Sequence, residues 1–145
     1  MHLKSPRNSD SVYDAVSRLE GKLTPSLSCR NINLRQYSNK LFDNGRVWIH
    51  YDNEKPISII AGYFNDNNTK IAYLSMLVVE DEYRGKHLAS ELLSEFEGYA
   101  NKTGMQRVKL EVRKNNDVAI TFYKKNKYKI IGEASESSYY MIKNI

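Results

Sequence analysis

A short basic, glycine-containing segment lies between an apolar run and a helical pattern, and its residue types suit anion binding. The apolar run ends at Val79, acidic residues follow, and Arg84-Gly85-Lys86 leads into the helical pattern near His87. A strand that passes through such a loop into a helix presents free backbone N–H groups and the positive end of the helix dipole. Gly85 lets the backbone approach a phosphate closely, and the two basic side chains add positive charge. The segment therefore predicts an anion site, with an ordinary surface turn as the alternative.

The elements around this segment follow from hydrophobic spacing. Alternating or continuous apolar runs predict strands at 47–51, 57–64, 71–79, 108–112, 128–134 and 138–142. Apolar residues three and four apart predict helices at 9–20, 34–43, 87–103 and 116–125. Hairpins at both ends and a strand-helix-strand unit between them imply an α/β fold. We expect a single-domain mixed, mostly antiparallel twisted sheet with helices on both faces.

Three local features complete this interpretation. Residues 1–8 resemble a loose terminus, and Ser9 or Ser11 is expected to cap the first helix. The tripeptide Thr24-Pro25-Ser26 indicates a break in the chain. In the helix after Asn116, we expect Val118, Ala119, Phe122 and Tyr123 to share a face, with Phe122 packed inward and Tyr123 at the edge of a cleft.

Composition limits the class of protein. The chain has 145 residues, a formal net charge of +5 and 41% hydrophobic residues, which fits one globular domain and a polyanionic ligand. The basic residues form no run of five or six, so we expect no nucleic-acid partner. Cys29 is the only cysteine, and the three histidines lack ligand spacing, so we expect no metal. The sequence has no long apolar run, which favours a soluble cytoplasmic protein without a membrane partner.

The basic segment resembles the acetyl-CoA-binding motif of the GNAT superfamily of N-acetyltransferases, Arg/Gln-x-x-Gly-x-Gly/Ala. Arg84 and Ala89 fit its first and last places, whereas His87 replaces the middle Gly, and we expect His87 to have φ < 0. The resemblance implies that this loop binds the pyrophosphate of coenzyme A. The implied cofactor-binding residues are Leu77, Val78 and Val79 for the pantetheine arm, and Arg84, Gly85, Lys86, His87, Leu88, Ala89 and Ser90 for the phosphates.

A second segment is similar to the same family at the usual separation from the first. It contains Leu110-Glu111-Val112-Arg113, then Asn116-x-x-Ala119-Ile120, then Phe122-Tyr123-x-Lys125. In the family this segment forms the other wall of the cofactor cleft, which adds Asn116 to the binding residues. The family's Gly after the Phe-Tyr helix is Lys127 here, and we expect Asn126 to supply the left-handed residue. The resemblance implies one acetyltransferase domain over 1–145, with an acetyl-CoA-binding core at 70–134 and a helical acceptor-side region at 9–45.

Two side chains are candidates for the chemistry of acetyl transfer. The reaction needs a base for the amine proton and an acid for the departing thiolate. The resemblance assigns the acid to Tyr123, whose phenol stays protonated at neutral pH. Glu111 is the candidate base, because strand alternation turns it away from Leu110 and Val112 and because relatives that acetylate protein N-termini carry a catalytic Glu in the same tetrapeptide. A packed aromatic and a solvated strand-face charge are the respective alternatives.

The sequence therefore predicts an acetyl-CoA-dependent N-acetyltransferase that transfers an acetyl group to a primary amine. The acceptor is a protein N-terminus or a small amine, and a homodimer is compatible with the sequence. The first alternative is a non-catalytic acyl-CoA-binding module. The second is a basic nucleic-acid binder, which the dispersed charge disfavours.

Overall fold

The strands form one seven-stranded sheet in the order β1-β2-β3-β4-β5-β7-β6. We use a computed structural model and describe residues 1–23 and 25–145, so Thr24 of the predicted break lies outside the described residues. The strands are β1 (His2–Lys4), β2 (Gly45–Asp52), β3 (Lys55–Tyr63), β4 (Ile71–Val79), β5 (Arg107–Arg113), β6 (Lys129–Ser135) and β7 (Ser138–Asn144). Neighbouring strands are antiparallel except for the parallel pair β4 and β5. This confirms the predicted mixed, mostly antiparallel sheet.

Helices cover both faces of the sheet. They are α1 (Ser9–Leu19), α2 (Leu34–Asn44), α3 (Leu88–Lys102) and α4 (Asp117–Lys125), with short 3-10 turns η1 (Glu20–Lys22), η2 (Ser28–Arg30) and η3 (Asp81–Tyr83). One apolar cluster joins α1 and α2 to β2, β3 and the end of β4. A second cluster joins α3 and Tyr123 of α4 to the other face of the sheet, including Leu110 and Val112 of β5. The sheet therefore separates two cores, and each of the four α-helices contributes buried residues to one of them.

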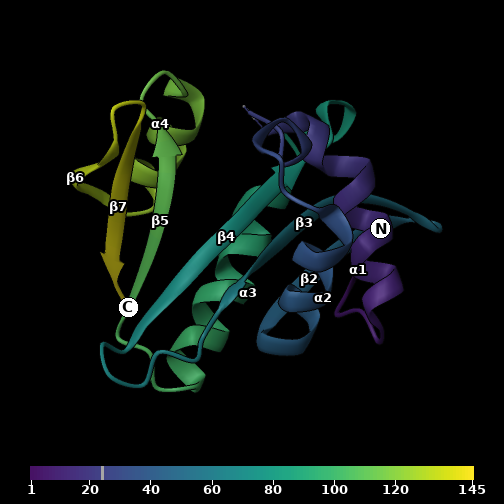
Figure 1. Cartoon of the computed structure of the whole chain (residues 1–145), viewed down its shortest axis with the longest axis horizontal. Coiled ribbons are helices and arrows are strands. Elements are labelled where there is room, and N and C mark those ends of the chain that lie inside the picture. Colours follow the sequence, from purple (N-terminus) through teal and green to yellow (C-terminus); the bar gives the residue numbers. More distant parts are fainter. Residues whose placement is uncertain (24) are drawn as a thin grey trace.

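The strands β4 and β5 pair over only part of their length. Their register runs from Ile71↔Arg107 to Leu74↔Leu110 and then stops. Figure 1 shows the two strands close together at one end and diverging towards the other, where α4 follows β5. We call the point after Leu74 and Leu110 the fork. The edge of β4 that faces β5 has no strand partner from Ser75 to Val79 among the described residues.

A bulge in β4 lies directly beside the fork. Ala61 pairs with Met76 and Gly62 pairs with Leu74, so Ser75 is left without a partner on β3. Before the bulge, Ala72 and Leu74 face the α3 core; after it, Met76 and Val78 face the α1–α2 core. The bulge therefore reverses which residues of β4 point to each core, as an extra residue in one strand requires. Gly62 is needed here, because a Cβ would lie 2.1 Å from the Tyr73 carbonyl oxygen.

The N-terminus corrects two expectations. Residues 2–4 are not loose but form β1, which pairs antiparallel with β2 from His2↔Tyr51 to Lys4↔Ile49. The first helix is capped by Asn8, whose side chain accepts a hydrogen bond from the Ser11 N–H at 2.9 Å, and not by either predicted serine. Pairing with an edge strand is a tertiary contact, so local composition gave no sign of it.

Candidate functional site

The loop between β4 and α3 contains a run of free backbone N–H groups. Within the described part of the chain, the N–H groups from Gly85 to Ser90 donate no hydrogen bond. The other three α-helices are each capped by an asparagine, Asn8, Asn33 or Asn116. The residue before α3 is His87, which makes no such bond. The start of α3 therefore has unpaired donors and the positive end of the helix dipole, which suit an anion; binding of an anion there stays a prediction.

The backbone of this loop is left-handed at two positions. Gly85 has φ 78° and His87 has φ 62°. The expectation that His87 has φ < 0 is therefore wrong: His87 takes the left-handed conformation that the family's Gly would adopt without a steric cost. Histidine is one of the residues enriched in that region among non-glycines, which makes the substitution physically tolerable.

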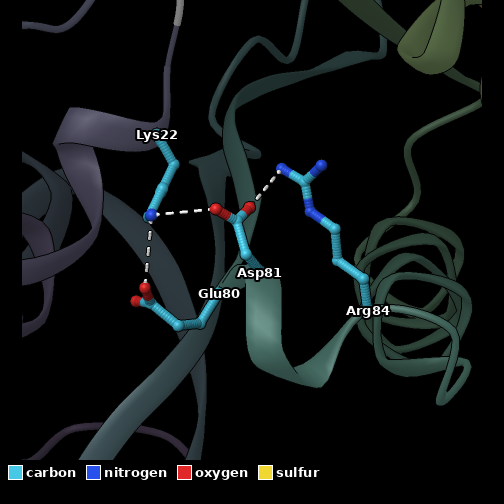
Figure 2. A network of polar contacts seen from close by, with 4 residues as sticks. All are labelled: Lys22, Glu80, Asp81 and Arg84. Carbon is cyan, nitrogen blue, oxygen red and sulfur yellow. Dashed lines mark hydrogen bonds and ion pairs between the residues drawn. The ribbon is translucent and has the colours of Figure 1, made fainter.

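A network of ion pairs holds the start of this loop, as Figure 2 shows. Lys22 of η1 bridges two carboxylates, with its Nζ 3.5 Å from Glu80 and 3.1 Å from Asp81. Asp81 also contacts the Arg84 guanidinium at 3.3 Å. The hydrogen bond and charge of Lys22, followed by the charge of Arg84, lower the pKa of Asp81. The Arg84 side chain is therefore turned towards Asp81. The negative charge of Asp81 offsets part of the positive charge that we predicted for the loop.

The open edge of β4 supplies a second set of backbone groups. The Glu80 N–H bonds to the Ile57 carbonyl on β3, and residues in an antiparallel strand point alternately to one edge and the other. The N–H groups of Leu77 and Val79 therefore point to the unpaired edge, and that of Val78 points to β3. Of the three residues predicted to bind through this edge, only Leu77 and Val79 have amides turned towards it.

Glu111 lies at the fork, one residue past the last β4–β5 pair. It is exposed and pairs across β7 with Tyr140. Its neighbours Leu110 and Val112 are buried in the α3 core, so Glu111 lies on the opposite face of the sheet, as its alternation predicted. That face carries α1 and α2. The Glu111 carboxylate is accessible from this face, and its role as a base stays a prediction.

Tyr123 is buried on the α3 side of the same fork. Its side chain belongs to the α3 core, and its ring packs edge-on against Phe122 and Tyr128 with centroids 5.4 and 5.5 Å away. Burial raises the pKa of Tyr123 well above its usual range. Tyr123 is 8% exposed and Phe122 is only half-buried, so the expectation that Phe122 packs inward and Tyr123 lies at an edge is wrong.

The rest of α4 also differs in detail from the prediction. Val118 is 77% exposed and does not share the packed face. Asn116 caps the helix, its Oδ1 accepting from the Ala119 N–H at 3.1 Å, so its side chain already has a structural role. The left-handed residue after the helix is Lys127, with φ 75°, and not Asn126, whose φ is −92°.

A buried histidine lies beneath the start of α3, and it was not among the predicted site residues. His50 is 2% exposed, and its Nδ1 lies 2.7 Å from the Ser58 hydroxyl. Its Nε2 lies 3.3 Å from the Glu91 carboxylate without the geometry of a hydrogen bond. His50 thus links β2 and β3 to the first turn of α3. On β2, Trp48 lies two residues before His50 and is buried on the same face of the sheet. This alternation along the strand is the signal that could have indicated a buried His50.

Across the described residues, 1–23 and 25–145, we find no helix with the length and apolar character needed to cross a membrane. In the same residues, His, Cys, Asp and Glu form no group of three that could hold a metal ion.

Comparison with known proteins agrees with this architecture. Residues 13–128 match the acetyltransferase (GNAT) family. Acetyltransferase SG1711 of Sodalis glossinidius is 36% identical over 73 residues, which cover 50% of this chain and 49% of that protein, so the match spans about half the length of the relative.

Solved structures share the fold over the whole chain. An acetyltransferase from Streptococcus agalactiae has a TM-score of 0.81 at 21% identity, covering 99% of this chain and 98% of that one. The PaiA N-acetyltransferase from Thermoplasma acidophilum, solved in complex with coenzyme A, has a TM-score of 0.75 at 18% identity and covers 100% of both chains. At these identities the likeness concerns the fold alone, whereas the family match covers most of the chain. The chain belongs to the acetyltransferase (GNAT) family.

Proposed function

We propose that this protein is an acetyl-CoA-dependent N-acetyltransferase that transfers an acetyl group from the thioester to a primary amine by direct attack. The observation that carries the proposal is the fork between β4 and β5. There an unpaired strand edge adjoins a helix start with free amides, and Glu111 and Tyr123 lie on opposite faces of the sheet. The acetyl donor and the amine can thus approach from the two faces.

The donor side is supported by backbone groups. The free amides from Gly85 to Ser90 suit a pyrophosphate, and a Cβ added at Gly85 would meet no protein atom within 4 Å, so the loop surface there is open. The amides of Leu77 and Val79 suit the amide groups of an extended pantetheine arm, which adds to the open edge as another strand would. One of them can also donate to the thioester oxygen as negative charge develops on it.

Glu111 would act on the acceptor side. It takes a proton from the ammonium group, directly or through a water, so that the neutral amine can attack the thioester carbon. The helical region that covers this face, 9–45, would then border the acceptor. When the carbon–sulfur bond breaks, the thiolate needs a proton, and Tyr123 would supply it from the other face. Its raised pKa keeps the phenol protonated at every working pH.

One observation favours the alternative of a non-catalytic acyl-CoA-binding module. Tyr123 packs against Phe122 and Tyr128 as a core aromatic does, and that role requires no chemistry. In such a module the loop and the strand edge would bind the donor without turnover. The two functions differ in one measurable property, which is release of the coenzyme A thiol.

The test measures thiol release from acetyl-CoA with a panel of small amines and N-terminal peptides, alongside calorimetric titration with coenzyme A. Amine-dependent release with an acetylated product identified by mass is the expected result. Binding of coenzyme A without release for any acceptor would favour the non-catalytic module. Absence of both would contradict the proposed donor site itself.

A further inference from the structure

Polar side chains gather around Tyr73 on the sheet face that carries Glu111. Tyr73 pairs with Tyr63 on β3 and with Lys109 on β5, and directly paired residues share a face. Burial, followed by the charges of the nearby Glu111, Tyr140 and Tyr37, raises the pKa of Tyr73 to about 12, and Arg30 opposes this shift. These groups come from four strands, from α2 and from η2, so they form one surface and not a local sequence cluster.

A hollow of about 270 Å³ lies on this surface, one row of residues from the fork. Tyr63, Tyr73 and Lys109 line it on the sheet, and Asp66 and Thr69 line it at the β3–β4 loop. It is large enough for part of a small acceptor molecule. Glu111 is close enough to the lining residue Tyr73 to act on it electrostatically, so the hollow adjoins Glu111 and can hold the portion of an acceptor that does not react.

The charges in and around the hollow are unequal. Within the described residues, neither Lys109 nor Arg30 has a carboxylate partner, and the Lys109 ammonium lies 4.1 Å from the centre of the Tyr140 ring. Asp66 is already engaged, because its carboxylate accepts hydrogen bonds from the Asn68 and Thr69 N–H groups at 3.1 and 3.0 Å. The hollow therefore offers one ammonium group, from Lys109, and the phenol hydroxyls of Tyr63 and Tyr73. The Asp66 carboxylate at its loop end stays charged but is bound to its own backbone, so Glu111 is the exposed carboxylate available to the amine.

We propose that the acceptor is an amine that also carries an anionic group, a carboxylate or a phosphate, and that Lys109, assisted by Arg30, holds that group while Glu111 faces the amine. Alternate residues of one strand lie about 7 Å apart, so an acceptor only a few bonds long spans Lys109 and Glu111. A polycation would instead place a further positive charge beside Lys109, which has no carboxylate partner among the described residues. This inference rests on the proposed acetyl transfer at the fork.

The experiment uses matched amines with the protein saturated in coenzyme A or acetyl-CoA. Glucosamine 6-phosphate against glucosamine tests a phosphate, glycylglycine against glycylglycine amide tests a carboxylate, and spermidine is the polycation. Binding is measured by calorimetry with coenzyme A present, and kcat/KM by thiol release. Lys109→Met is the test variant, and Lys102→Met, at the exposed end of α3, is its control.

We expect the anionic member of at least one pair to be preferred by about tenfold or more, the scale of one charge-assisted contact. Lys109→Met should reduce that preference to about threefold or less while coenzyme A affinity stays unchanged, and Lys102→Met should keep it. The difference between the phosphate and carboxylate pairs identifies the group that binds.

Three results would overturn the inference: equal affinity within both pairs, tighter binding of spermidine, or a preference that survives in Lys109→Met. Failure of every amine to bind would overturn it too. Preferential binding of the anionic amines without thiol release would support the anion site and contradict the proposed acetyl transfer, so the two failures can be told apart.

Discussion

Glu111 and Tyr123 lie on opposite faces of the sheet beside the fork between β4 and β5. Tyr123 packs in the α3 core with Leu110 and Val112, the two neighbours of Glu111 on β5, and Glu111 points away from that core. A base and an acid separated by the plane of the sheet cannot neutralise each other directly. The arrangement suits a reaction in which a proton is removed from the nucleophile on one face of the sheet and a proton is delivered to the leaving group on the other.

Glu111→Gln should lower turnover by roughly a hundredfold, because the amide keeps the shape of the side chain but accepts no proton. Coenzyme A affinity and melting temperature should stay unchanged, since Glu111 is exposed and has no ion pair in the described residues. Steady-state kinetics across neutral pH provide the measurement. Glu54→Gln, in the exposed β2–β3 turn, is the matched control. Equal turnover in Glu111→Gln and wild type would remove Glu111 from the mechanism.

Gly85→Val should weaken coenzyme A binding by roughly tenfold or more, about 1.4 kcal/mol, because the side chain occupies the surface that a phosphate approaches. Gly104→Val is an unusually close control. Gly85 and Gly104 have φ 78° and 88°, and an added Cβ would meet no atom within 4 Å at either place. Both variants should lose a similar stability, about 1–2 kcal/mol, from left-handed strain. Calorimetry should then find weakened binding only in Gly85→Val; equal loss in both would show that strain alone is responsible.

Asp81→Asn should strengthen coenzyme A binding by about two- to fivefold at low salt, because it removes a negative charge beside the loop and releases Arg84. Lys22 lowers the pKa of Asp81 most, and Arg84 lowers it further, so the carboxylate stays charged across neutral pH. The difference between variant and wild type should therefore persist until the pH falls below that lowered pKa. Asp10→Asn, which breaks the remote pair with Arg35, is the control and should leave binding unchanged. Unchanged affinity in Asp81→Asn would show that Arg84 does not contribute.

His87→Gly and His87→Ala should both keep coenzyme A affinity within about tenfold, because the loop binds through amides that neither change removes. Their stabilities should differ. Gly relieves about 1 kcal/mol of strain at φ 62°, partly offset by its greater freedom in the unfolded chain, whereas Ala retains the strain. Thermal melts should therefore place His87→Gly above His87→Ala. A hundredfold loss of affinity in both variants would indicate that the imidazole itself binds a phosphate.

Hydrophobic periodicity was sufficient to predict most of this fold, whereas the capping residue of α1 was predicted wrongly. The alternation from Ile71 to Val79 gave β4 with its observed ends, and the spacing of Leu92 and Phe96 gave the buried face of α3. The bulge at Ser75 and the strand β1 depend on register and pairing between distant segments, which no local pattern contains.

The sequence was sufficient to predict where the candidate site lies in the chain, but not how its side chains and backbone are oriented. Phe122 and Tyr123 are consecutive on a short helix, so the helical pattern alone allows either of them to be the buried residue. Tyr123 is the buried one, and its ring packs against Tyr128, which lies outside the helix. For His87 we expected a negative φ, because a positive φ is costly for most residues with a side chain. The loop nevertheless adopts a positive φ at His87. The ion pairs of Lys22 join residues about sixty positions apart, beyond the reach of any spacing rule.

Tyr123→Phe should lower turnover by roughly ten- to a thousandfold, about 1.4 to 4 kcal/mol, while coenzyme A affinity barely changes. The hydroxyl would matter only when negative charge develops on the departing sulfur, so its loss should affect the transition state more than binding. Burial raises the pKa of Tyr123, so the wild-type phenol stays protonated at pH values up to the ordinary pKa of tyrosine. Turnover should therefore show no loss from ionisation of this phenol up to pH about 10.

Tyr128→Phe is the control for this variant, because it removes the hydroxyl of the neighbouring ring, which donates to the Glu97 carboxylate at 2.7 Å. That change should cost stability through a lost hydrogen bond, about 1.5–3 kcal/mol with a charged acceptor, and leave the chemical step intact. Kinetics and melts on both variants separate the two roles. Full activity in Tyr123→Phe, with a normal melt, would show that water or another group protonates the thiolate. Tyr123 would then act in this protein as a packed aromatic of the α3 core.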